Sequence, residues 1–76
     1  MKTERMILTS VWTQITTGKE TRFVQSESHQ FAICSSDVEP SVDQPYHVIE
    51  GGAVIQPPTV AWIRALYPAQ IEITIT

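Results

Sequence analysis

The stretch that decides the fold is residues 59–76, TVAWIRALYPAQIEITIT. Residues 71–76 alternate isoleucine with a polar residue, and this period of two places all three isoleucines on one face of a strand. Residues 59–66 form a second β-rich run, and Pro68 lies between the two runs at a position suited to a turn. The stretch therefore predicts a C-terminal β-hairpin, with Trp62 and the isoleucines as the main apolar mass of the core.

Further β-rich runs precede this stretch. The sequence predicts a hairpin of residues 10–15 and 21–26 around Gly18, a strand over 29–35, and a hairpin of 46–50 and 53–56 around Gly51 and Gly52. No run has a helical period, and Pro and Gly interrupt the runs. The predicted fold is all-β, a small single-domain β-sandwich or barrel of about six to seven short antiparallel strands.

The strand predicted over 29–35 is apolar on both faces. Phe31 and Ile33 share one face, and Ala32 and Cys34 share the other. This pattern predicts that the core covers one face and that a subunit or partner covers the other.

Two segments carry few apolar residues. Residues 1–9 are expected to be a polar N-terminal arm, of which the first five are either mobile or ordered only on a partner, and residues 10–76 the β-domain. Residues 37–45 contain Pro40 and Pro45, which cannot donate ladder hydrogen bonds, so they are expected to be a surface loop. Such a loop is either a contact element or a crossing between sheets, and the crossing is favoured slightly.

The length makes the core marginal. A chain of 76 residues buries only about 60% of the surface that its unfolded form exposes. Cys34 is the only cysteine, so no intramolecular disulfide can form, and two histidines with one cysteine are too few for a structural zinc site. Oligomerisation is therefore the expected support, and the low charged fraction of 17% suits burial against a partner.

The charge argues against some partners. The net charge is -3, and the five basic residues are scattered, so nucleic-acid binding is not expected. The apolar runs are far shorter than the roughly 20 residues that span a bilayer, and no secretion signal is seen. We expect no membrane partner, and synthesis in a reducing cytoplasm.

No motif predicts catalysis. His29 and His47 have no nucleophile in a recognisable motif nearby, and Cys34 lies in an apolar run where a free cysteine behaves as a small buried hydrophobe. Gly51 and Gly52 precede a strand and not a helix, so they form no phosphate-binding loop. We expect no enzyme activity, no catalytic residues and no cofactor.

Two other binding patterns have simpler interpretations. Asp37, Glu39 and Asp43 have the spacing of oxygen ligands, but prolines interrupt the pattern, and a solvated loop is favoured over a metal site. An aromatic platform for sugars is the second pattern, although tryptophans in a small β-domain belong more often to the core. Its members would be Trp12, Tyr46, Trp62 and Tyr67.

Residues 12–18, WTQITTG, the proline-flanked middle loop, and residues 60–65, VAWIRA, with the alternating C-terminal strand, resemble the short all-β virion proteins of tailed bacteriophages. This class includes head-decoration proteins and the head-binding domains of fibres. The resemblance covers residues 11–76, and residues 1–10 have no counterpart in it. It implies a structural subunit on a capsid or at a fibre base, commonly a trimer.

The sequence therefore predicts a non-enzymatic virion structural protein. It would be a capsid decoration or cementing subunit, a homotrimer bound to a larger lattice such as a major capsid protein, and located in the virion. A small β-sandwich module that binds a carbohydrate or a host protein is the alternative. A small inhibitor that presents residues 37–45 is a third and weaker hypothesis.

Overall fold

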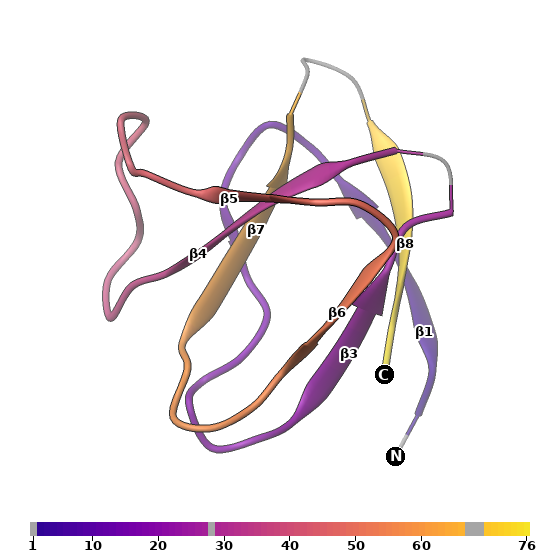
Figure 1. Ribbon diagram of the computed structural model, residues 1–76, viewed down its shortest axis with the longest axis horizontal. Helices are drawn as coiled ribbons and strands as arrows, with labels where there is room; N and C mark the ends of the chain where they lie inside the picture. Colours follow the sequence, from indigo (N-terminus) through magenta and orange to yellow (C-terminus); the bar gives the residue numbers. More distant parts are fainter. Residues whose placement is uncertain (1, 28, 67–69) are drawn as a thin grey trace.

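The computed structural model describes residues 2–27, 29–66 and 70–76 (Figure 1). In these ranges the chain forms no helix and eight antiparallel strands, which build two four-stranded sheets packed as a sandwich. The strands are β1 (Glu4–Leu8), β2 (Thr13–Gln14), β3 (Arg22–Gln25), β4 (Phe31–Ser35), β5 (His47–Ile49), β6 (Gly52–Ile55), β7 (Ala61–Ala65) and β8 (Ile71–Ile75). The predicted all-β fold is confirmed.

Each sheet combines strands that are distant in the sequence. Sheet A has the order β1-β8-β3-β6, and sheet B has the order β2-β7-β4-β5. The chain thus forms two long antiparallel ribbons. Each ribbon bends once, so that one pair of its strands lies in sheet A and the other pair lies in sheet B. In the first ribbon β1 pairs with β8 in sheet A, and β2 pairs with β7 in sheet B. In the second ribbon β3 pairs with β6 in sheet A, and β4 pairs with β5 in sheet B. The ribbons meet where β8 pairs with β3 and β7 with β4.

Backbone hydrogen bonds continue the pairing at both bends. The N–H of Ala65 donates to the carbonyl of Thr9 at 2.7 Å in the first ribbon, and the N–H of Ser26 donates to the carbonyl of Gly51 at 2.7 Å in the second. Gly51 has a φ of 87°, in the left-handed region that favours glycine. The turn predicted at Gly51 is therefore real, but it carries the chain from sheet B to sheet A.

The three predicted hairpins are wrong for one reason. β2 and β3, β5 and β6, and β7 and β8 each lie in opposite sheets. In each case the chain passes to the other sheet. Turn residues indicate that the chain changes direction, but they do not indicate whether the next strand pairs with the previous one or joins the other sheet. Residues 67–69 of the turn predicted after residue 66 lie outside the described residues.

The long middle loop is also not what the sequence predicts. It was expected to cross between sheets, yet β4 and β5, which it joins, pair directly within sheet B, with Phe31 opposite Ile49. Among the described strands, this is the only pair that is consecutive in the chain and adjacent in a sheet. The loop therefore returns the chain to the same sheet.

The predicted polar arm, residues 1–9, is wrong over most of its length. β1 pairs with β8 from Glu4 opposite Ile75 to Leu8 opposite Ile71. Leu8 is fully buried, and Arg5 points outward and forms an ion pair with Glu72 at 2.9 Å. The alternation of the strand is concealed because Glu4 shares the inner face with Leu8 and Ile7 is exposed on the outer face. The β-domain therefore begins well before residue 10.

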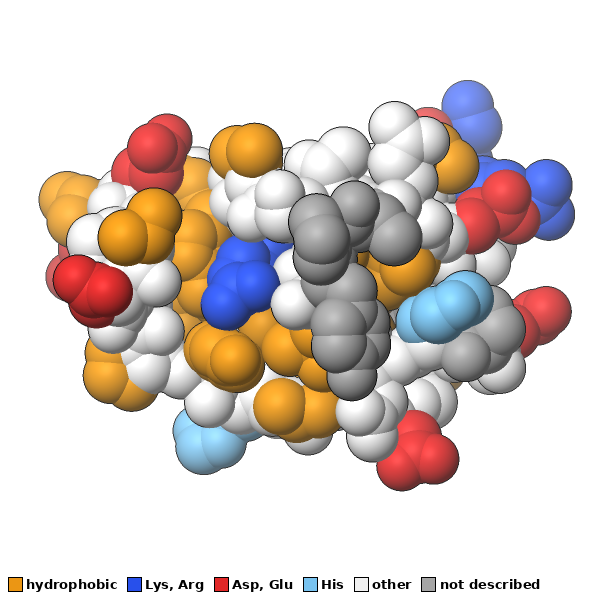
Figure 2. Space-filling model, turned by 90° about the horizontal axis from the view of Figure 1, so that it is seen from above, with side chains coloured by type: hydrophobic (Ala, Val, Ile, Leu, Met, Phe, Trp, Pro, Cys, Tyr) orange, Lys and Arg blue, Asp and Glu red, His pale blue; other side chains and the backbone are white. Residues whose placement is uncertain are grey.

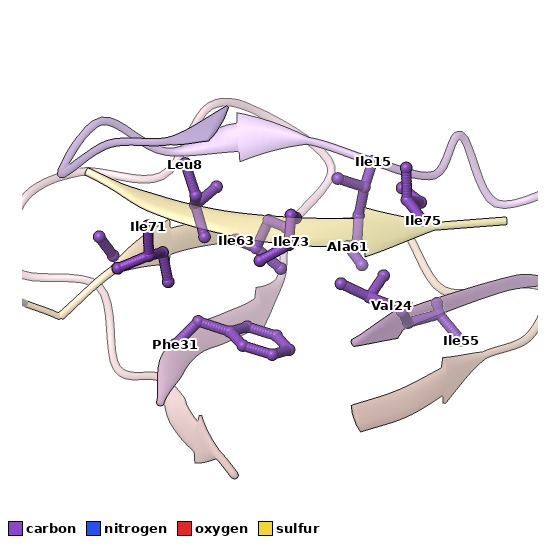
Figure 3. Close-up of a cluster of buried hydrophobic side chains, with 11 residues drawn as sticks. Leu8, Ile15, Val24, Phe31, Ile55, Ala61, Ile63, Ile71, Ile73 and Ile75 are labelled. Carbon is purple, nitrogen blue, oxygen red and sulfur yellow. The ribbon is translucent and has the colours of Figure 1, made fainter. Parts of the chain in front are cut away.

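The main core lies between the two sheets (Figure 3). The three isoleucines of β8 belong to it, as predicted, and Ile63 of β7 faces them across the sandwich. Trp62 does not belong to this core, because neighbouring side chains of a strand point to opposite faces. It is half-buried on the outer face of sheet B. Its predicted place in the core is wrong. The buried members are Leu8, Ile15, Val24, Phe31, Ile55, Ala61, Ile63, Ala65, Ile71, Ile73 and Ile75.

Two connections, β2–β3 and β6–β7, lie at the end of the sandwich opposite the bends, and Thr16 joins them. Its buried hydroxyl donates to the carbonyl of Thr59 at 2.7 Å and accepts from the N–H of Ala61 at 2.8 Å. Gly18 lies beside it with a φ of 95°, and a Cβ at Gly18 would lie 3.0 Å from the carbonyl oxygen of Pro58. The β2–β3 and β6–β7 connections therefore lie side by side (Figure 1), and glycine permits their close approach.

Candidate functional site

A second apolar cluster covers the outer face of sheet B. Ala32 and Cys34 of β4 point away from the main core and are buried against Trp12, with Trp62 and Leu66 packed at the side. The sequence predicts that a subunit or partner covers this face of β4. The structure shows that this is wrong, because Trp12 of the same chain covers it.

Arg64 lies at the edge of this cluster against two aromatic rings. Its guanidinium carbon is 5.1 Å from the centroid of the Trp12 ring and 4.7 Å from the centroid of the Tyr46 ring. The two rings meet edge to face, with centroids 6.3 Å apart and an interplanar angle of 63°. Each cation–π contact contributes about 0.5–1 kcal/mol or more. The three side chains thus hold one another in place.

The same surroundings determine the state of Cys34. Burial raises the pKa of the Cys34 thiol, and the positive charge of Arg64 opposes this shift only in part. The thiol is therefore protonated at neutral pH. Because the thiolate is the nucleophile, the structure does not support a reactive cysteine here.

The two indoles anchor the middle loop, residues 36–46. The Nε1–H of Trp12 donates to the carbonyl of Ser41 at 3.3 Å, and the Nε1–H of Trp62 donates to the carbonyl of Ser36 at 2.9 Å. Two further bonds within the loop shape it: Ser36 Oγ to the Val38 carbonyl at 2.6 Å, and the N–H of Gln44 to the Ser41 carbonyl at 3.2 Å. The position of this loop is therefore set by the cluster that it borders.

Exposed apolar side chains surround the cluster. A hollow of about 270 Å³ is lined by Ser10, Trp12, Val42 and Arg64. Seen from above, hydrophobic side chains gather on the left half of the surface around a basic side chain, with acidic side chains farther left (Figure 2). We call these exposed residues the apolar rim: Val11, Val38, Val42, Tyr46 and Val48, which are 41 to 91% exposed.

The charges around the hollow form no ion pairs in the described part of the chain. Arg64 donates one hydrogen bond, from Nη1 to the carbonyl of its neighbour Ala65 at 3.0 Å. The ion pairs formed among the described residues are Lys2 with Glu4 and Arg5 with Glu72. Arg64 therefore has no carboxylate within 4 Å among residues 2–27, 29–66 and 70–76. In the same ranges the three acidic residues of the loop have no basic partner; they are Asp37, Glu39 and Asp43.

The predicted candidates for chemistry lie apart from this cluster or within its packing. His29 and His47 are exposed, His29 after β3 and His47 in β5. Among the residues that the structure describes, no three of His, Cys, Asp and Glu are grouped so that they could hold a metal ion. Nor does this part of the chain contain a helix long and apolar enough to cross a membrane.

The predicted aromatic platform is only partly assembled. Trp12 and Tyr46 do meet, but Trp12 is 8% exposed and Trp62 is half-buried, so their ring faces are not open for a sugar. Tyr67 lies outside the described residues. Sequence reasoning missed Arg64, because nothing local shows that residues 12, 46 and 64 meet. The sequence does place Arg64 two residues after Trp62 in a predicted strand, so the two side chains are expected on the same face.

Comparisons of the chain with protein-family models, with curated proteins and with solved structures found no match.

Proposed function

We propose that the protein is a non-enzymatic structural subunit that associates with copies of itself, as a homotrimer, and docks on a larger protein lattice in a virion. The observation that carries this proposal is the apolar rim. Five large apolar side chains are exposed around one cluster on sheet B, on a domain of only 76 residues. Hydrophobic side chains that gather on one part of the surface (Figure 2) favour a site of protein association.

The site also favours association over binding of a small ligand. The hollow is half open to solvent, and its walls include the ring of Trp12, against which Arg64 already lies. Ligand sites are usually concave and bury most of the ligand. Burial of the rim removes apolar surface worth roughly 25 cal/mol per Å², before the costs of association.

Sedimentation velocity at micromolar concentration tests the self-association. We expect a species with three times the 8.5 kDa mass of one chain. Val48→Lys, in the rim on edge strand β5, should shift the equilibrium to the monomer. Val54→Lys is the matched control, because Val54 is similarly exposed on edge strand β6 but lies on the outer face of sheet A.

Co-sedimentation tests the docking. Particles of the virus that encodes the chain should carry it through a density gradient, and the Val48→Lys variant should be depleted from them relative to Val54→Lys. A chain that is monomeric at all concentrations and absent from particles would overturn the proposal and leave a free-standing binding module.

A further inference from the structure

Arg64 is unusual among the basic residues because its orientation is fixed. The guanidinium is stacked on Trp12 and Tyr46 and uses one of its N–H groups in a hydrogen bond to the carbonyl of Ala65. An arginine has five N–H donors in a planar fork that matches a carboxylate. Arg64 is half-buried at the edge of the hollow, where a carboxylate would pair with it in partly desolvated surroundings.

The middle loop presents chemistry that fits this site. Asp37, Glu39 and Asp43 are all exposed, and they stand next to Val38 and Val42, which are 71% and 91% exposed. The loop therefore offers carboxylates beside apolar side chains. The hollow offers a guanidinium beside an indole wall, which is the complementary arrangement.

Within the described part of one chain these groups do not pair. No ion pair joins Arg64 to the loop in residues 2–27, 29–66 and 70–76, although Val42 of the loop lines the same hollow. Two indole hydrogen bonds, to the carbonyls of Ser36 and Ser41, fix the loop in this position. A second copy is not subject to this constraint, and its loop carries the same carboxylates and valines.

We propose that Arg64 binds a carboxylate of residues 37–43 of a second copy, with a valine of that loop packed in the hollow. This inference rests on the proposed self-association and identifies the contact that forms it. The contact is an attraction between opposite charges at a half-buried site, so rising salt should screen it and weaken the contact.

A charge swap tests the proposal by sedimentation velocity and native mass spectrometry. Arg64→Glu alone, and Asp37→Lys with Glu39→Lys and Asp43→Lys together, should each raise the dissociation constant by about 30-fold or more. An equimolar mixture of the two variants should form mixed complexes that neither variant forms alone, because two of the three contacts in a mixed ring of three copies join opposite charges. A merely structural role of Arg64 would not give this recovery.

Two controls keep the test decisive. Arg5→Glu reverses a charge on the outer face of sheet A and should leave the association unchanged. If Arg64→Glu does not fold, as judged by circular dichroism, Arg64→Gln removes the charge without burying a new one. Arg64→Gln should also raise the dissociation constant. The loop variant should do the same, and its three positions are exposed, so it is expected to fold.

The outcomes separate this inference from the proposed function. If the wild-type chain associates and the Arg64 and loop variants associate equally well, the Arg64 contact is wrong and the self-association stands. Variants that dissociate but do not recover on mixing would also overturn the contact. A wild-type chain that stays monomeric would overturn both the Arg64 contact and the proposed self-association.

Discussion

The two apolar clusters of this protein differ in how they are closed. The main core is closed on both sides by a sheet, so Phe31, Ile63 and Ile73 are at most 1% exposed. The second cluster has a sheet on one side, and on the other it is covered by single side chains, among them Trp12 and Arg64, and by a loop. A cluster closed by single side chains leaves apolar groups at its border, and this is where the apolar rim lies. A second apolar face on a strand can therefore be covered by the chain itself and still leave apolar side chains exposed around it.

The largest expected effect tests the main core. Phe31→Ala should lower the free energy of unfolding by about 3–5 kcal/mol, because Phe31 is fully buried and its removal leaves a cavity. Urea unfolding followed by circular dichroism measures the loss. Phe23→Ala is the matched control: Phe23 is 43% exposed on the outer face of sheet A, and its loss should cost less than about 1 kcal/mol. Equal losses for the two variants would contradict the assignment of the core.

The second cluster should contribute less. Trp62→Ala should lower the free energy of unfolding by about 2 kcal/mol. This is roughly half of the loss typical of a fully buried tryptophan, because the ring of Trp62 is half-buried. Trp62→Phe keeps much of the ring but loses the hydrogen bond to Ser36, and should cost about 1 kcal/mol. Urea unfolding of both variants beside Phe31→Ala gives the comparison. A loss for Trp62→Ala as large as that for Phe31→Ala would mean that the two clusters act as one core.

The smallest expected effect is on reactivity and not on stability. Because burial raises the pKa of Cys34, the thiolate forms at higher pH in the folded chain than in the unfolded chain. At about pH 8 the Cys34 thiol of the folded chain should react with a chromogenic disulfide reagent roughly tenfold more slowly than the same thiol in denaturant. Trp62→Ala should speed it in the folded state, and Phe23→Ala should not. A fast reaction of the wild-type chain would show that the second cluster is open.

Much of the fold could be predicted from the sequence, but the pairing of strands could not. The alternation in residues 71–76 correctly places three isoleucines in the core, and the two apolar faces of β4 correctly indicate a strand that is covered twice. The turn signals at Gly18 and at Gly51 indicate where the chain reverses, and Gly18 has the positive φ that was expected. They do not indicate whether the next strand joins the same sheet, since that depends on residues far away in the chain.

The candidate site was predicted less well than the fold. Trp12 and Tyr46 were both singled out, but as a possible platform for sugars, and Arg64 was noted only as a scattered basic residue. The cluster depends on β7 lying between β2 and β4, which brings Arg64 beside Ala32. Local patterns in the sequence do not show this register, so the contact between residues 12, 46 and 64 was not predicted.

The two bent ribbons also determine when the domain can fold. β8 lies between β1 and β3 in sheet A, and Glu4 at the start of β1 pairs with Ile75 near the other end of the sequence. Sheet A is therefore incomplete until residue 75 has left the ribosome, and β1 lacks its strand partner until then. Folds dominated by such distant pairings close large loops before contacts reward them, and they fold slowly. During synthesis the apolar residues of β1 remain unpaired, so folding of this domain follows its translation and does not accompany it.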